Sequence, residues 1–319
     1  MRQRITSSRM MGMGTVHHLI QTRGIEEARR EAASASAHQR LCVEAAFEVM
    51  GDEAGKIGIA HAGFAMAALP HKKTAETVWE REGGSVKLLV ESGLDVNRRP
   101  IGIPYGSVAR LILIYLQTQA VRTRSRKVEL GGSMNAWLGA MGLPVGGKTY
   151  QLVREQARRL SRCRLTFFRR AGGSELVTNG AFVRDSILPL DSTHSQMPLW
   201  QEQVTLDEGF YQSLIDHPLP LREKAIQAVS GRSMAIDIYV WLAYRLHALS
   251  GPVEVGWPAL KSQFGESYKE LRFFRRDALP SLDLALAAYP EAKVLIDEKR
   301  GLTLYPSAPP VPERKLLAG

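Results

Sequence analysis

Apolar residues recur at helical spacing over much of the chain, and short alternating stretches lie between these segments. Largely buried helices are predicted at residues 106–122 and 233–249, where apolar side chains fill most positions. The spacing predicts further helices at residues 21–50, 133–141, 149–162, 206–217, 221–229, 257–264 and 267–279, the last continuing beyond a kink at Pro280. Alternation predicts strands at 127–130, 163–170, 175–183, 253–255, 293–297 and 302–305, and a hairpin at 77–90 around Gly83-Gly84. The pattern predicts an α+β fold that is mainly helical.

One order of elements occurs twice. A buried helix, a short strand, two further helices and a β-hairpin follow one another from residue 106, and again from residue 233. Two helices in a helix-turn-helix with an appended hairpin form a winged helix. We therefore expect two tandem winged-helix domains with a helical N-terminal extension. The expected boundaries are 1–56 for the extension, partly disordered, 57–200 for the first domain, and 201–319 for the second with its proline-rich tail.

The positive charge is concentrated in one part of the chain. The net charge is +10, yet residues 98–170 hold fifteen Lys or Arg against only Glu129 and Glu155, a local charge of +13. A solvated surface normally mixes its signs, so a block of one sign favours the phosphates of a nucleic acid. Cys42 and Cys163 form no C-x-x-C pair, which favours a reducing, cytoplasmic compartment. No apolar run approaches the roughly 18 residues of a membrane span, so a membrane is not an expected partner.

Residues 142–149 read GLPVGGKT and match the phosphate-binding loop of nucleotide hydrolases. Such a loop follows a buried strand, whereas residues 133–141 have the spacing of a helix. We therefore interpret Gly146-Gly147 as a turn, with Lys148 and Thr149 at a helix N-terminus that binds a nucleic-acid phosphate. A P-loop NTPase, in which the strand ending at Asp297 would hold magnesium, is the less favoured alternative.

Two helices are expected to read DNA. Over residues 149–162, Leu152, Val153, Ala157 and Leu160 are expected to face inward, and a cationic stripe to face outward. The DNA-binding candidates of this domain are Arg122, Arg124, Arg126, Lys148, Thr149, Gln151, Arg154, Arg158 and Arg162.

In the second domain, Leu271, Phe274, Ala278 and Leu282 are expected to face inward. Phe273 is either a core residue or an exposed apolar contact, and the core is the favoured interpretation. The candidates there are Tyr268, Lys269, Arg272, Arg275 and Arg276 on the helix, with Lys299 and Arg300 at the tip of the hairpin.

Catalytic and metal-binding patterns are absent from the sequence. The eight histidines form no H-E-x-x-H or other paired-ligand spacing, and no G-x-S-x-G occurs. The sequence predicts no catalytic residue, no metal and no cofactor, and hence a protein that is not an enzyme.

Several stretches resemble the plasmid-encoded RepA replication-initiator family over roughly residues 60–310. They are 69–73 (LPHKK), 103–111 (IPYGSVARL), 119–126 (QAVRTRSR), 146–148 (GGK) with 154–160 (REQARRL), 235–245, Trp257 with 263–265, 273–276, 289–290 and 301–302.

The resemblance implies a bacterial plasmid protein, cytoplasmic and associated with the nucleoid or plasmid, that binds repeats in the double-stranded DNA of the origin. It also implies recruitment of host helicase and initiator proteins, a homodimer that represses its own promoter, and no need for ATP hydrolysis. A winged-helix transcriptional repressor without initiator activity is the alternative that the sequence leaves open.

Overall fold

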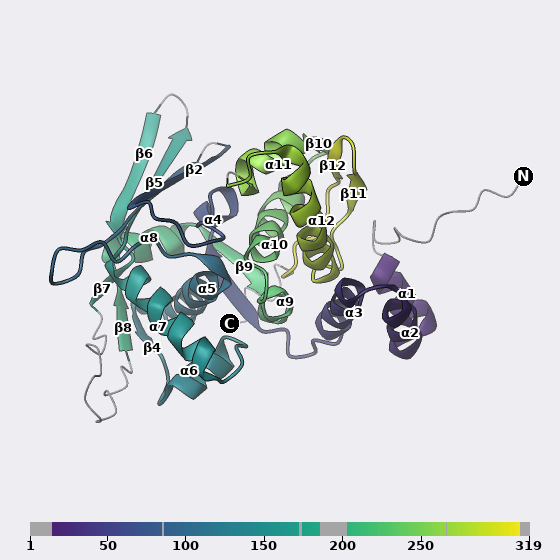
Figure 1. Cartoon of the computed structure of the whole chain (residues 1–319), viewed down its shortest axis with the longest axis horizontal. Helices are drawn as coiled ribbons and strands as arrows, with labels where there is room; N and C mark the ends of the chain where they lie inside the picture. The colour runs from purple at the N-terminus through teal and green to yellow at the C-terminus, as the bar shows by residue number, and fades with distance from the viewer. Residues whose placement is uncertain (1–14, 85, 172–173, 186–202, 266, 313–319) are drawn as a thin grey trace, which may run out of the picture. The chain divides into compact units, whose positions relative to one another are not determined.

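The computed structural model describes residues 15–84, 86–171, 174–185, 203–265 and 267–312. Residues 1–14 and the predicted connector at 188–198 lie outside the described residues. The chain forms two compact units: a central unit of residues 57–220, and a terminal unit that joins residues 1–56 to residues 221–318. Helices and small sheets occur in both (Figure 1), which confirms the predicted α+β class.

Helices and strands follow one another along the chain of the central unit. Its elements are β1 (Ile57–His61), α4 (Gly63–Met66), β2 (Val78–Gly83), β3 (Val86–Glu91), α5 (Gly106–Thr123), β4 (Lys127–Glu129), α6 (Met134–Ala140), α7 (Gly147–Arg162), β5 (Arg164–Ala171), β6 (Ser174–Ala181), β7 (Val183–Asp185), β8 (Gln203–Leu206), α8 (Glu208–Asp216) and β9 (Pro218–Arg222), whose last two residues belong to the terminal unit.

Helix α5 is the core of the central unit. Its apolar residues from Ala109 to Leu116 are almost all buried, as the sequence predicts. Its buried polar residues bind one edge of β1: Gln117 accepts a hydrogen bond from the backbone N–H of His61 at 2.5 Å, and Thr118 accepts one from Ile59 at 2.8 Å. These side chains satisfy backbone groups that would otherwise be buried without partners.

Two antiparallel sheets complete the central unit. One has the strand order β2-β3-β5-β6, so the two predicted hairpins pair edge to edge through β3 and β5. The other has the order β4-β8-β7, in which β8 lies between two strands that precede it in the sequence. The sequence pattern predicts no strand at 203–206, because the alternation of apolar and polar positions over four residues is too short to indicate one.

The terminal unit combines the first three helices with the C-terminal third of the chain. Its elements are α1 (Thr15–Arg23), α2 (Ile25–Ala35), α3 (Ala37–Met50), α9 (Glu223–Val229), α10 (Ser233–Arg245), the 3-10 helix η1 (Leu246–Ala248), β10 (Val253–Gly256), α11 (Trp257–Phe264), α12 (Leu271–Ala287), β11 (Val294–Asp297) and β12 (Gly301–Leu304).

Aromatic pairs join the helices of this unit. Trp241 packs edge-on against Phe264, and Trp257 against Phe274, so α10, α11 and α12 share one core. The strands β10, β12 and β11 form an antiparallel sheet in that order. The second predicted copy therefore has the expected order of a helix, a strand, two helices and a hairpin.

Some boundaries differ from the sequence pattern. The predicted helix at 21–50 is broken at Gly24 and again at Ser36. The Ser36 hydroxyl caps α3 by accepting from Gln39 N–H at 3.1 Å. Residues 15–50 pack within the terminal unit; for example, His17 Nε2 lies 2.8 Å from the carbonyl of Ala287. Whether the three predicted segments 1–56, 57–200 and 201–319 fold as separate domains stays a prediction.

Candidate nucleic-acid interface

The GLPVGGKT segment forms a turn between two helices. Ser133 caps α6 by accepting from Ala136 N–H at 3.2 Å, and α6 runs to Ala140 directly before the segment. Gly142 has a φ of 69°, a left-handed conformation that favours glycine, and Gly146 is the N-cap of α7. A helix therefore stands where a P-loop needs a buried strand, which contradicts the structural context of the NTPase alternative.

Asp297, the residue that the NTPase alternative would assign to magnesium, serves the hairpin turn. Its Oδ1 accepts hydrogen bonds from the backbone N–H of Lys299 at 2.8 Å and of Arg300 at 3.0 Å. These bonds stabilise the charged carboxylate and lower the pKa of Asp297. They also fix Lys299 and Arg300 at the exposed tip of the β11–β12 hairpin.

Helix α7 has one buried face and one cationic face. Val153, Gln156, Arg159 and Leu160 are buried. The outward residues are Lys148, Gln151, Arg154, Arg158 and Arg162, all exposed, with Thr149 half-buried; we call these six the α7 stripe. Among the described residues, no carboxylate lies within ion-pair distance of the stripe's lysine or arginines. Their charge is therefore free to bind an external anion.

The inward face of α7 differs from the predicted one at Leu152. The sequence pattern assigned this residue to the core, but its side chain is 43% exposed. The prediction was wrong because the buried face is centred on Val153, Gln156 and Leu160, which places Leu152 at the edge of the stripe.

Arg159 anchors α7 to the rest of the central unit. Its guanidinium donates to Glu155 Oε1 at 2.8 Å and to the carbonyl of Ile103 at 2.9 Å, and it lies over the ring of Tyr105. Gln156 accepts from the backbone N–H of Tyr105 at 2.9 Å. Glu155 is one of only two acids in the cationic segment 98–170. Its carboxylate thus pairs with Arg159 on the inner side of the helix and not with the arginines of the stripe.

Two of the stretches that carry the family resemblance meet at a buried arginine. Arg110, from 103–111, donates to the carbonyls of Leu69 at 2.6 Å and Pro70 at 3.2 Å, both from 69–73. The same segment, 103–111, holds α7 through Ile103 and Tyr105. These residues therefore build a scaffold that orients α7, a role that their spacing in the sequence did not reveal.

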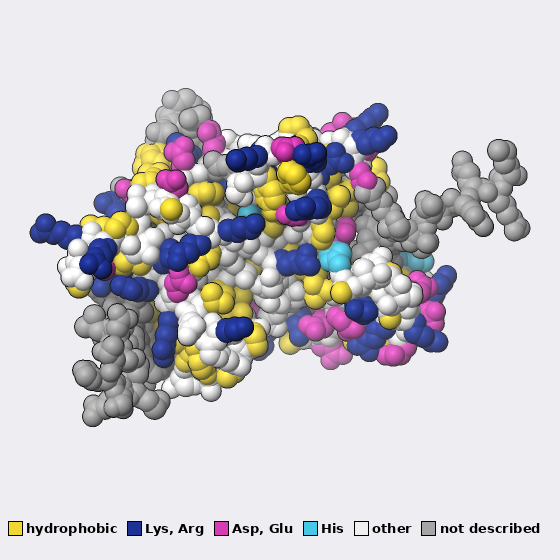
Figure 2. All heavy atoms as spheres, viewed as in Figure 1, with side chains coloured by type: hydrophobic (Ala, Val, Ile, Leu, Met, Phe, Trp, Pro, Cys, Tyr) yellow, Lys and Arg dark blue, Asp and Glu magenta, His cyan; other side chains and the backbone are white. Residues whose placement is uncertain are grey.

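The candidates at the C-terminal end of α5 and directly after it differ in their surroundings. Arg122 and Arg124 are exposed, and Arg124 ends α5 in a left-handed conformation with a φ of 50°. Arg126 pairs with Glu208 at 3.1 Å, so part of its charge is neutralised. On the face in Figure 2, Lys and Arg side chains are frequent over α7 and the projecting loop beside it, with few acids among them; over α1–α3 the two signs are mixed.

The cationic candidates of the terminal unit are more strongly compensated. Tyr268 and Lys269 precede α12, which begins at Leu271, so their predicted place on the helix is wrong. Arg272 pairs with Glu270 at 2.9 Å and Arg276 with Asp277 at 2.8 Å. Arg275 is half-buried with its guanidinium 5.8 Å from the ring centre of Trp257.

Phe273 is exposed, contrary to its predicted place in the core. Its ring is 40% exposed, and the guanidiniums of Arg272 and Arg276 lie 4.7 and 5.6 Å from the ring centre. Phe274, one position on, fills the core instead. Two adjacent aromatic residues cannot both face inward on one helix, and the pattern alone did not say which one does.

The histidine with a serine partner in the described part of the chain is not arranged as a catalytic base. His61 Nε2 lies 2.9 Å from Ser213 Oγ, but His61 Nδ1 accepts from Gly63 N–H at 3.0 Å. The hydrogen of the ring is therefore on Nε2, which cannot act as a base toward the serine. Among the described residues, no group of three or more His, Cys, Asp or Glu could hold a metal ion.

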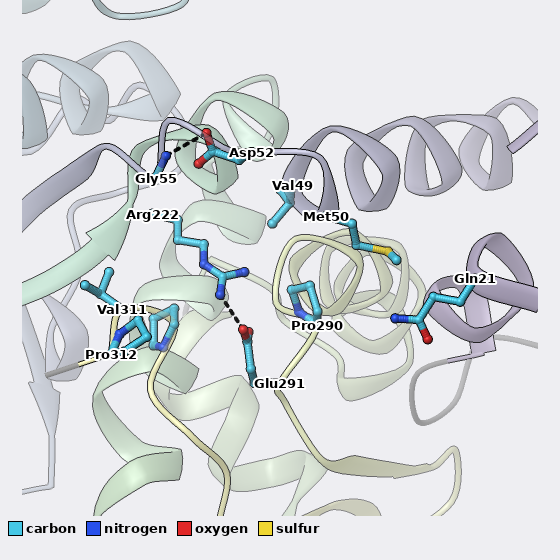
Figure 3. Close-up of a pocket in the computed structure, with 11 residues that line it drawn as sticks. Gln21, Val49, Met50, Asp52, Gly55, Arg222, Pro290, Glu291, Val311 and Pro312 are labelled. Carbon is cyan, nitrogen blue, oxygen red and sulfur yellow. Dashed lines mark hydrogen bonds and ion pairs between the residues drawn. The ribbon is translucent and has the colours of Figure 1, made fainter. Parts of the chain in front are cut away.

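A pocket of about 290 Å³ lies within the terminal unit (Figure 3). Its charged side chains already have partners: Arg222 forms an ion pair with Glu291, and Asp52 accepts from Gly55 N–H. Its remaining wall is formed largely by Val49, Met50 and the proline-rich residues 310–312. Within the described ranges, none of the helices has the length and hydropathy to cross a membrane.

Comparison with one solved structure supports the fold. A crystal structure of domains 2 and 3 of RctB, determined on selenomethionine derivatives, matches with a TM-score of 0.51 at 11% identity, over 76% of this chain and 97% of that chain. A second crystal structure of RctB domains 2–3 matches with a TM-score of 0.46 at 12% identity, over 76% and 94% of the two chains. No protein in the curated set matches the sequence.

The sequence itself matches a known family over residues 103–254, which include α5, the α7 stripe, α10 and the scaffold around Ile103. The family is described as plasmid-encoded RepA protein. The resemblance noted in the sequence is therefore confirmed: residues 103–254 belong to the family of plasmid-encoded RepA proteins.

Proposed function

We propose that this protein initiates plasmid replication by binding repeats in the double-stranded DNA of the origin, through tandem winged helices and without catalysis. Membership of the RepA family implies a role in plasmid replication. The observation that carries the DNA-binding role is the α7 stripe: exposed cationic side chains on one helix face, with no ion pair to the described residues. In this proposal α7 enters the major groove, where arginine and glutamine side chains bind base edges and phosphates.

The terminal unit supplies the second reading helix, α12. Two of its three arginines, Arg272 and Arg276, are paired with neighbouring acids, so its electrostatic contribution is smaller than that of α7. Phe273 adds an exposed apolar surface, and such surfaces contact thymine methyl groups in direct readout. Tyr268, Lys269, Arg275, Lys299 and Arg300 belong to the same proposed surface. Host helicase and initiator proteins, and a homodimer at the promoter, remain the proposed partners.

A binding titration tests the DNA-binding role. The probe is a duplex fragment carrying the DNA directly upstream of the coding sequence, measured between 50 and 200 mM salt. If six or more phosphates are neutralised, the affinity falls on the order of 10³-fold or more over this range. The double variant Arg154→Ala/Arg158→Ala should weaken binding roughly 10- to 100-fold, because two charge-assisted contacts are lost.

Arg23→Ala/Arg30→Ala is the matched control, since it removes the same charge from exposed positions on α1 and α2. Equal losses for both double variants, or an affinity that does not respond to salt, would contradict the assignment of the α7 stripe. A plasmid that carries only this gene and its flanking DNA then distinguishes initiation from repression: a repressor leaves the plasmid unable to replicate, whereas an initiator maintains it.

A further inference from the structure

Residues 93–100 form a projecting loop with exposed arginines, and this loop has no role in the function proposed above. We call this segment the arm. Leu94 and Pro100 pair across it as an antiparallel bridge, and its tip carries Val96, Arg98 and Arg99. Val96 is 86% exposed, and both arginines are exposed, without an ion pair to any described residue. Figure 1 shows the arm as the dark-blue loop that projects from the central unit, and Figure 2 shows cationic side chains at its tip.

The arm is held in one conformation by its own hydrogen bonds. Asp95 Oδ1 accepts from the backbone N–H of Asn97 at 2.9 Å and of Arg99 at 2.8 Å. Asp95 N–H donates to the carbonyl of Arg99, and Arg98 N–H to that of Asp95. Arg98 has a φ of 60°, which non-glycine residues rarely adopt and which places its side chain at the tip. Little conformational entropy is therefore lost when the arm binds a partner.

The base of the arm is fixed to the C-terminal end of α7. A Cβ atom on Gly93 would lie 2.2 Å from the carbonyl oxygen of Arg162, so the two backbones are in direct contact. Ile101 N–H donates to the carbonyl of Gly93 at 2.9 Å, and Gly102 N–H to Ser92 Oγ at 2.8 Å. Arg159 holds Ile103 just beyond this point. The base of the arm thus lies against Arg162, the last residue of the α7 stripe.

The length of the helix indicates where the arm reaches on a duplex. From Lys148 to Arg162 the helix rises about 21 Å, at about 1.5 Å per residue. The major groove is only about 12 Å wide. When the N-terminal half of α7 lies in the groove, its C-terminal end reaches the edge of the groove and the arm lies beyond it, over the flanking backbone and minor groove.

We infer that the arm is a second DNA-binding element, which places Arg98 and Arg99 in the minor groove beside the major groove that α7 enters. Guanidinium groups suit this site because a narrow minor groove concentrates negative potential. The inference rests on the proposed function of α7. The arm adds a contact that depends on the width of the minor groove. It hence favours A·T-rich sequence beside the site that α7 recognises.

Hydroxyl-radical footprinting tests the inference, because this reagent cleaves DNA at sugars along the minor groove. The probe is the duplex fragment upstream of the coding sequence. The wild-type protein should protect an additional minor-groove window at one side of the site. Arg98→Ala/Arg99→Ala should lose that window alone, bind about tenfold more weakly, and show a salt slope smaller by about 2. Both residues are exposed, so the thermal melting temperature should not change.

The control Arg23→Ala/Arg30→Ala should retain the window. If the arm variant keeps the full footprint, or loses affinity with the window intact, the minor-groove assignment is wrong although the protein binds DNA. If the wild-type protein protects no part of the fragment, the proposed function fails, and this inference fails with it. The two failures are therefore distinguishable.

Discussion

Two adjacent arginines on α7 have opposite environments, and this difference gives a prediction at the scale of single residues. Arg159→Ala should lower the free energy of unfolding by about 2 kcal/mol, because it leaves the buried carbonyl of Ile103 without its donor and removes the nearest cation from Glu155. Arg158→Ala should change it by less than about 0.5 kcal/mol and should instead weaken DNA binding. Urea unfolding and DNA titration of both variants measure these effects.

Each of these variants is the control for the other, since they differ by one position and remove the same charge. Similar losses of stability in both, or a normal affinity in Arg158→Ala, would contradict the assignment of the faces of α7. The sequence predicted the outward arginines because apolar positions mark the opposite face. It could not predict the role of Arg159, since its partners Ile103 and Tyr105 lie far away in the chain.

At the scale of elements, local patterns predicted most helices and hairpins but not their pairing. The periodicity of α5, α7 and α10 and the glycine turn at residues 83–84 are local signals, and the structure confirms these elements. The pairing of β3 with β5 and the insertion of β8 depend on contacts between distant strands. Phe273 was misplaced for a related reason, because packing against Trp257 selects Phe274 for the core.

The α6–α7 turn yields a prediction at this scale. Lys148→Ala should weaken DNA binding a few-fold, since the side chain is exposed at the N-terminus of α7, where phosphates bind favourably. Wild-type protein should show no ATP hydrolysis above the background of buffer, because a helix precedes the turn. A phosphate-release assay and a DNA titration measure the two properties. Hydrolysis that disappears in Lys148→Ala would restore the NTPase alternative.

At the scale of the whole molecule, each unit buries a neutral histidine. Burial is the main cause that lowers the pKa of His61 to about 3, and the nearby His217 and Arg169 lower it further. Burial also lowers the pKa of His17 in the terminal unit, whose ring faces the carbonyl of Ala287. In the unfolded chain both rings bind a proton near pH 6.5. The unfolded state therefore binds more protons than the native state below that pH.

The contribution of these two histidines to the free energy of unfolding should accordingly be constant above pH 6.5. It should decrease as the pH drops from 6.5 toward 3. For His61 alone the loss by pH 5 is about 2 kcal/mol, at about 1.4 kcal/mol per pH unit. His61→Gln removes the proton-binding site, so the difference in unfolding free energy between pH 7.5 and pH 5 should shrink by about that amount, even if the variant is less stable at both. His18→Gln, at an exposed position, should behave as wild type. Urea unfolding followed by tryptophan fluorescence measures the difference, and an unchanged difference in His61→Gln would show that the ring is not neutral in the folded protein.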